Sequence, residues 1–171
     1  KWFRRFFASP FSFRLIRNTI MLSGYSIIFG FPAPIIFAIC VTQIRNMKIR
    51  RTIQTASYLP HFISTVVVVG ILHNFLSLNH GIINNVVEML GGERINFLLT
   101  PSYFRTIYVA SGVWQRFGFS SIIYIAAIVG IDPSLYESAQ IDGITKFKEA
   151  WYITLPSIAQ TIIILFILNL G

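Results

Sequence analysis

Long apolar runs, separated by short polar connections, limit the folds open to this chain more than any other feature. Four runs predict membrane-spanning helices, at residues 18–41, 57–78, 107–131 and 156–171. The first run has 24 residues and would reach roughly 36 Å as a helix, enough to cross the hydrocarbon core of a bilayer. Within lipid, only helices and closed barrels satisfy every backbone polar group. We therefore expect an all-α, polytopic membrane helix bundle, with residues 1–171 in a single transmembrane domain.

The composition supports this membrane assignment. Hydrophobic residues make up 54% of the chain and charged residues 12%, and the mean hydropathy is +0.67. A soluble domain carries about 25% charged residues. The single cysteine, Cys40, excludes a disulfide framework or a cysteine metal site within the chain. We expect no metal site.

The net charge of +8 is compatible in principle with nucleic-acid binding. The basic residues at the start of the chain, however, are interleaved with aromatic residues that share one helical face, namely Trp2, Phe3, Phe6 and Phe7. This pattern is typical of a basic helix that lies at the level of the lipid headgroups. We therefore expect membrane lipid as a partner and no nucleic acid.

Both ends of the sequence suggest a piece of a longer chain. It begins at Lys1 without an initiator methionine and stops at Gly171 inside an apolar run. That run, Ile158 to Leu170, has 13 residues, whereas a span takes about 20. We therefore expect a fragment truncated at both ends, with an incomplete fourth span.

The connections between spans differ in character. Residues 43–55 carry four basic residues and no acid, which is typical of a cytoplasmic loop. Residues 80–105 contain a short amphipathic helix that ends at Gly91-Gly92. The number of lysine and arginine residues nevertheless does not orient the chain in the membrane. Connections 43–55 and 132–156, on one side, together carry six, and segments 1–17 and 79–105, on the other side, carry seven.

The polar segment 132–156 is the most patterned part of the sequence. Asp132 places negative charge near the start of a helix that Ser134 can cap and that we expect at 135–141. Gly143 then breaks the helix. A second amphipathic helix follows and Pro156 starts the next span; the apolar face of this helix comprises Ile144, Phe147, Trp151 and Leu155.

The spacing in this segment resembles the EAA loop of ABC importer permeases. That motif reads Glu-Ala-Ala, a glycine four residues after the last alanine, nine residues, and then Ile-x-Leu-Pro. The chain has Glu137-Ser138-Ala139, Gly143, Ile153 and Leu155-Pro156 at the same spacing, and departs from the motif at Ser138 and Ile144. The resemblance extends over the whole chain and is greatest for the sugar and polysaccharide branch, as seen at Asn18-Thr19, residues 57–64, Trp114-Gln115 and residues 131–143.

The resemblance implies the fold of a type I ABC importer permease, in the bacterial cytoplasmic membrane. The chain would be a transport subunit and not an enzyme, with 132–156 as the cytoplasmic coupling loop that docks on a separate ATPase subunit. No Walker-type phosphate loop is present, so ATP would be used by that partner and this chain would bind no cofactor. Further partners would be a second permease, by family habit in a heterodimer, and an extracytoplasmic solute-binding protein. The implied coupling residues are Glu137, Ser138, Ala139, Asp142, Gly143, Ile153, Leu155 and Pro156.

Arg116 stands about ten residues into the third span, where an arginine costs roughly 2.5–3.5 kcal/mol to insert. It can line a solute path together with Trp114 and Gln115, since an aromatic face and an amide suit a sugar. It can equally snorkel or pair within the bundle. The sequence leaves both interpretations open.

Two other classes of function compete with an ATP-driven permease. A secondary transporter would favour acids inside the membrane, but all six acids fall in predicted connections. A membrane-embedded enzyme would need a catalytic His, Asp or Glu cluster near the interface, and none is apparent, so we expect no catalytic residues.

Overall fold

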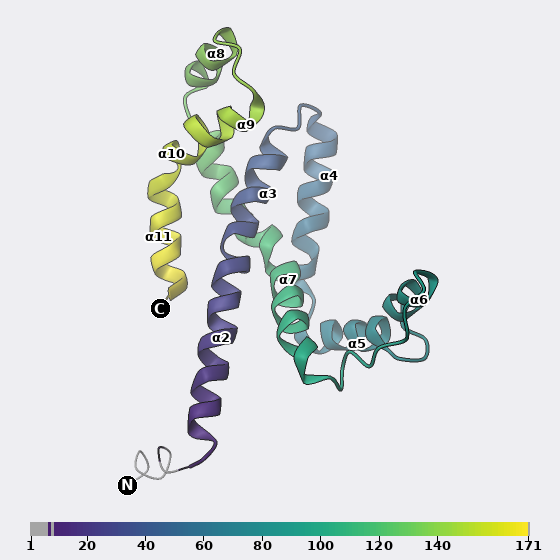
Figure 1. The fold of residues 1–171 in the computed structure, drawn as a ribbon. Helices are drawn as coiled ribbons and strands as arrows, with labels where there is room; N and C mark the ends of the chain where they lie inside the picture. The colour runs from purple at the N-terminus through teal and green to yellow at the C-terminus, as the bar shows by residue number, and fades with distance from the viewer. Residues whose placement is uncertain (1–6, 8, 171) are drawn as a thin grey trace. The chain divides into compact units, whose positions relative to one another are not determined.

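The computed structural model describes Phe7 and residues 9–170. Apart from Phe7, the aromatic residues of the expected interfacial helix lie outside this part of the chain. The described residues form helices, turns and no strand, which confirms the all-α prediction (Figure 1). The helices are α2 (Ser12–Gly30), α3 (Pro32–Thr42), α4 (Met47–Tyr58), a 3₁₀ helix (Leu59–Phe62), α5 (Thr65–Leu76), α6 (Ile82–Met89), α7 (Pro101–Val129), α8 (Pro133–Ile141), α9 (Lys146–Glu149), a π-helix (Ala150–Thr154), α10 (Leu155–Ser157) and α11 (Ala159–Leu170).

Two helical stretches of the described chain are long and apolar enough to cross a membrane, Ser12–Thr42 with 31 residues and Pro101–Val129 with 29. Two bent pairs meet the same criteria only when their halves are taken together: Met47–Phe62 with Thr65–Leu76, and Lys146–Ser157 with Ala159–Leu170. The expected spans at 18–41 and 107–131 each lie almost wholly within a long helix. Those at 57–78 and 156–171 instead correspond to helices interrupted by a break.

The basic connection 43–55, expected as a loop, is mostly helical. The side chain of Asn46 accepts hydrogen bonds from the backbone N–H groups of Lys48 (3.0 Å) and Ile49 (3.3 Å), and α4 begins at the next residue. Such an N-cap satisfies N–H groups that have no partner within the helix. The helix therefore starts about ten residues before the apolar run.

The chain divides into two compact units. The first comprises Lys1–Gly30 and Ile63–Val113, and the second comprises Phe31–Phe62 and Trp114–Gly171. In the first unit, Arg105 Nη2 donates to Asn18 Oδ1 at 3.0 Å, which connects α7 to α2. The predicted short amphipathic helix is confirmed as α6, and Gly91 after it adopts a positive φ of +82°.

The inward residue of α6 is polar. Asn84 is fully buried; its Nδ2 donates to the carbonyl oxygens of Ser77 and Ile95, both at 3.0 Å, and its Oδ1 accepts from the Ile95 N–H at 2.8 Å. Arg94 donates to the Leu78 and Asn79 carbonyl oxygens and pairs with Glu88 at 2.7 Å. These contacts hold the 77–95 segment in one conformation.

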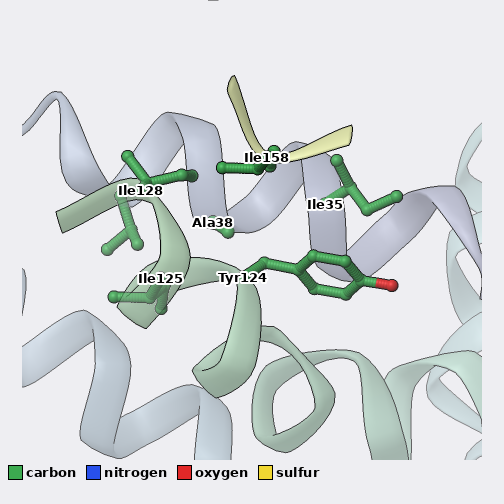
Figure 2. Packing of buried hydrophobic residues seen from close by; sticks show 7 residues of the cluster. Ile35, Ala38, Tyr124, Ile125, Ile128 and Ile158 are labelled. Carbon is green, nitrogen blue, oxygen red and sulfur yellow. The ribbon is translucent and has the colours of Figure 1, made fainter. Parts of the chain in front are cut away.

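The second unit contains an apolar core (Figure 2). Helix α3 contributes residues 35, 38 and 41, which are three positions apart, and α7 contributes residues 124, 125 and 128. At these spacings each helix turns a single face toward the core. Ile158, between α10 and α11, joins them and is 2% exposed. The core residues are Ile35, Ala38, Val41, Tyr124, Ile125, Ile128 and Ile158.

Candidate functional site

The candidate site is the polar segment 132–156, which lies wholly in the second unit. Helix α8 begins at Pro133 and is capped by Asp132, whose Oδ1 accepts from the Ser134 N–H at 2.9 Å. Ser134 was expected to be the cap, and this was wrong, because Pro133 favours the first helical position and leaves the cap to the residue before it. Hydrogen bonds from Ser134 hold the pKa of the Asp132 carboxyl below its ordinary value.

Gly143 ends α8 in a left-handed conformation, with φ at +68°. The Gly143 N–H donates to the Gln140 carbonyl at 3.1 Å, and the Ile144 N–H donates to the Ala139 carbonyl at 3.2 Å. These two bonds form a Schellman motif, in which glycine avoids the steric cost of a Cβ at positive φ. The predicted break at Gly143 is confirmed.

The second helix of the segment is not one regular amphipathic helix as expected. It is α-helical over Lys146–Glu149, becomes a π-helix over Ala150–Thr154, and continues as α10. Pro156 explains the change, since proline lacks an N–H and its ring would clash with the carbonyl four residues earlier, that of Tyr152. In the wider turn the Leu155 N–H donates to the Ala150 carbonyl, five residues back.

The chain then bends by 67° between Lys146–Ser157 and Ala159–Leu170. The break falls at Ile158, and the last apolar helix starts at Ala159, three residues later than the sequence suggested. Pro156 therefore lies in the approach to the final helix and not in its first turn.

The residues of the motif divide between an outward and an inward face. Ala139 is buried, whereas Ile153 and Leu155 are half-buried. The exposed members are Glu137, Ser138, Asp142, Gly143 and Pro156. The motif therefore contributes both to the surface of the segment and to its internal packing.

Two exposed apolar side chains adjoin the motif. Ile141 is 87% exposed and Phe147 is 78% exposed. Ile141 follows Glu137 by four residues and so shares its helical face. Ile141 was not among the predicted site residues, although its spacing from Glu137 could have indicated it.

Two side-chain contacts stabilise the segment from within. The Tyr136 hydroxyl lies 3.1 Å from Thr154 Oγ1. Lys146 Nζ lies 2.6 Å from Glu149 Oε2, and Glu149 is 6% exposed. Neither contact was predicted, since the first joins residues 18 positions apart and the second depends on a local burial that the sequence does not reveal.

The candidate solute-path residues lie within one turn of α7. Trp114 and Arg116 are exposed, and Gln115 is half-buried. Residues two apart on a helix point to different sides, so Trp114 and Arg116 do not share one face. Among the described residues, no three His, Cys, Asp or Glu side chains come together as metal ligands would.

Comparison with known proteins assigns the chain to a family. Residues 6–171 match the model described as binding-protein-dependent transport system inner membrane component, and the chain belongs to this family. It is similar to the polygalacturonan/rhamnogalacturonan transport system permease protein YteP of Bacillus subtilis (strain 168), with 40% identity over 100% of this chain and 53% of that protein. It is also 41% identical to Protein LplB of the same organism, over 99% of this chain and 54% of the relative.

A solved structure gives the same assignment. The chain matches a crystal structure of a bacterial ABC transporter involved in the import of the acidic polysaccharide alginate, with a TM-score of 0.94 and 46% identity. The match covers 99% of this chain and 59% of that one. The same degree of match holds for the alginate transporter in complex with alginate pentasaccharide-bound periplasmic protein. The expected permease fold is confirmed, and the chain spans about half the length of the relatives it matches.

Proposed function

We propose that the chain is part of a permease subunit of an ATP-driven importer in the bacterial cytoplasmic membrane. Its apolar helices contribute to the transmembrane solute path, and residues 132–156 couple that path to a separate ATPase subunit. The observation that carries the proposal is the α8 face of Glu137 and Ile141, fixed at its end by Gly143 with φ at +68°. An apolar residue with 87% exposure next to a carboxylate suits a helix that docks in a groove.

The geometry of α8 fits such a docking role. Both helix ends are capped, by Asp132 and by the Schellman motif at Gly143, so the helix can move as a stiff body. Glu137 is a natural partner for a basic group on the ATPase, and Ile141 for an apolar pocket beside it. ATP-driven closure of the ATPase subunits would then displace α8.

The proposed partners follow from this arrangement. ATP would be bound and hydrolysed by the ATPase subunits, and this chain would bind no cofactor. A second permease would complete the solute path, and it would be a different chain, as is usual in this family. The alginate transporter was solved with a solute-loaded periplasmic protein, which supports an extracytoplasmic solute-binding partner here as well.

We propose an acidic oligosaccharide as the solute. The relatives with about 40% identity or more include one named for polygalacturonan and rhamnogalacturonan, and one whose solute is alginate. These polymers carry uronate carboxylates. Arg116 lies on α7 at an exposed position, where a guanidinium could bind a carboxylate in bidentate fashion.

Site-directed cross-linking tests the proposed docking. In a full-length permease in which Cys40 and any cysteine elsewhere in the protein are replaced by serine, single cysteines replace Ile141 or Met89, which have the same 87% exposure. A bifunctional thiol-to-amine reagent is then applied to the assembled transporter, with and without ATP. We expect Ile141→Cys to form an adduct with the ATPase subunit and Met89→Cys, in α6, to form none. Absence of an adduct at Ile141→Cys, or an equal adduct at both positions, would overturn the proposal.

A further inference from the structure

A hydrogen bond bridges the two halves of the 132–156 segment. Tyr136 lies on α8, and its hydroxyl is 3.1 Å from Oγ1 of Thr154, the last residue of the π-helix. Tyr136 is half-buried and Thr154 is 4% exposed. On α8, Tyr136 shares the inward face with buried Ala139, three residues later. The proposed docking face and this internal contact therefore lie on different sides of one helix.

The direction of the bond follows from its surroundings. Thr154 Oγ1 also donates to the Glu149 carbonyl, at 3.4 Å. A threonine hydroxyl has a single proton, so Thr154 must accept from Tyr136 while it donates to Glu149. The three groups form a chain of hydrogen bonds in a largely buried place, where such bonds reinforce each other.

Thr154 connects these hydrogen bonds to the apolar core of the second unit. The Ile158 N–H donates to the Thr154 carbonyl at 3.1 Å. Ile158 is 2% exposed and packs among core residues of α3 and α7, including Ile35 and Ala38 (Figure 2). A displacement of Thr154 is thus passed directly to the packed core of the second unit.

The covalent route from α8 forward to the π-helix is less rigid. It passes through Gly143, whose position has no other atom within 4 Å of a Cβ built there. Glycine offers little resistance to backbone rotation. Without a second connection, α8 could pivot about Gly143 and leave the π-helix in place.

We propose that Tyr136 and Thr154 are positioning residues for energy coupling. Their hydrogen bond joins α8 to the π-helix across the Gly143 bend, so that a movement of the docked helix reaches Ile158 and the bundle core. The inference rests on the proposed coupling function of residues 132–156. It assigns the transmission step to two side chains outside the docking face.

The test uses the full-length permease with its ATPase and partner permease in proteoliposomes. A labelled galacturonate trisaccharide, delivered by the solute-binding protein, serves as the transported probe. The measured quantity is the number of ATP molecules hydrolysed per trisaccharide taken up. We expect Tyr136→Phe and Thr154→Val to raise this ratio roughly fivefold, the factor that corresponds to one net hydrogen bond.

Three further variants separate a coupling role from a structural one. Thr154→Ser keeps the hydroxyl and should restore the ratio, and the double variant Tyr136→Phe/Thr154→Val should be no worse than either single variant. Tyr152→Phe is the matched control, since it removes a hydroxyl from a side chain that is 71% exposed. An unchanged ratio in Tyr136→Phe, a ratio in Thr154→Ser as high as in Thr154→Val, or additive effects in the double variant would overturn the inference.

Cross-linking at Ile141→Cys distinguishes a failure of the proposed docking function from a failure of the transmission role of Tyr136 and Thr154. If this cysteine forms no adduct with the ATPase subunit in the otherwise unsubstituted transporter, the proposed function itself fails. If the adduct forms to the same extent with and without Tyr136→Phe, docking is intact. An unchanged coupling ratio in that case would refute only the transmission role of Tyr136 and Thr154.

Discussion

Gly118 of α7 lies directly against the backbone of Ser57 at the end of α4, so closely that a Cβ on Gly118 would overlap the Ser57 carbonyl group. Gly118 therefore permits a close approach of α7 and α4. Small residues allow two helix backbones to approach within a membrane bundle. The contact lies beside a stacked pair, His61 and Phe119, whose ring centroids are 4.0 Å apart.

We predict that Gly118→Ala destabilises the permease. The added methyl group meets backbone and not a mobile side chain, so α7 or α4 must shift, at a cost of roughly 1–3 kcal/mol. The thermal unfolding temperature of the purified complex should fall. Gly70→Ala is the control, because a Cβ there has no atom within 4 Å. A fall of the same size in both variants would contradict the prediction.

Asn84 should be essential for the conformation of the 77–95 segment. Replacing it with alanine leaves three backbone groups of Ser77 and Ile95 without their partner, at roughly 1–3 kcal/mol for each that stays buried. Amide hydrogen exchange at Ile95 should accelerate by about fivefold or more. Asn85→Ala, which removes an exposed contact with Arg94, should leave this rate nearly unchanged. Equal rates in both variants would speak against the role of Asn84.

Much of the fold could be predicted from hydropathy and from glycine and proline. The long apolar runs indicate the long helices, and Gly91 and Gly143 mark the ends of α6 and α8, because both require a positive φ. These signals are local in the sequence. The resemblance of residues 137–156 to a known loop then supplied the functional hypothesis.

The remaining features depend on structure that no local pattern records. The start of α4 at Met47 depends on the Asn46 cap, which precedes the apolar run. The π-helix depends on how the chain accommodates Pro156. The apolar pattern of residues 144–155 predicts a regular helix and gives no indication of this wider turn. The bond between Tyr136 and Thr154 joins residues 18 positions apart and requires the Gly143 bend to bring them together.

Arg116 provides a test of the proposed acidic solute. Arg116→Gln removes the charge and should raise the KM for the galacturonate trisaccharide roughly tenfold, because hydrogen bonds to charged groups contribute about 1.5–3 kcal/mol. Arg116→Lys should retain part of the affinity, and a neutral trisaccharide should not distinguish Arg116→Gln from the unsubstituted permease. Unchanged uptake of the acidic probe at equal expression would exclude Arg116 from the solute path.

The central claim is that residues 132–156 couple ATP hydrolysis to transport, and the most direct test compares two glycines. Gly143 and Gly91 both have a positive φ, at +68° and +82°, and a Cβ at either position meets no atom within 4 Å. Valine at either site therefore imposes a similar backbone strain, but only Gly143 orients the proposed docking helix. The measurement is ATP hydrolysed per trisaccharide taken up in proteoliposomes. We predict that Gly143→Val raises this ratio severalfold and that Gly91→Val leaves it unchanged. Normal assembly with normal transport in Gly143→Val, or an equal change of the ratio in both variants, would contradict the proposed coupling role of residues 132–156.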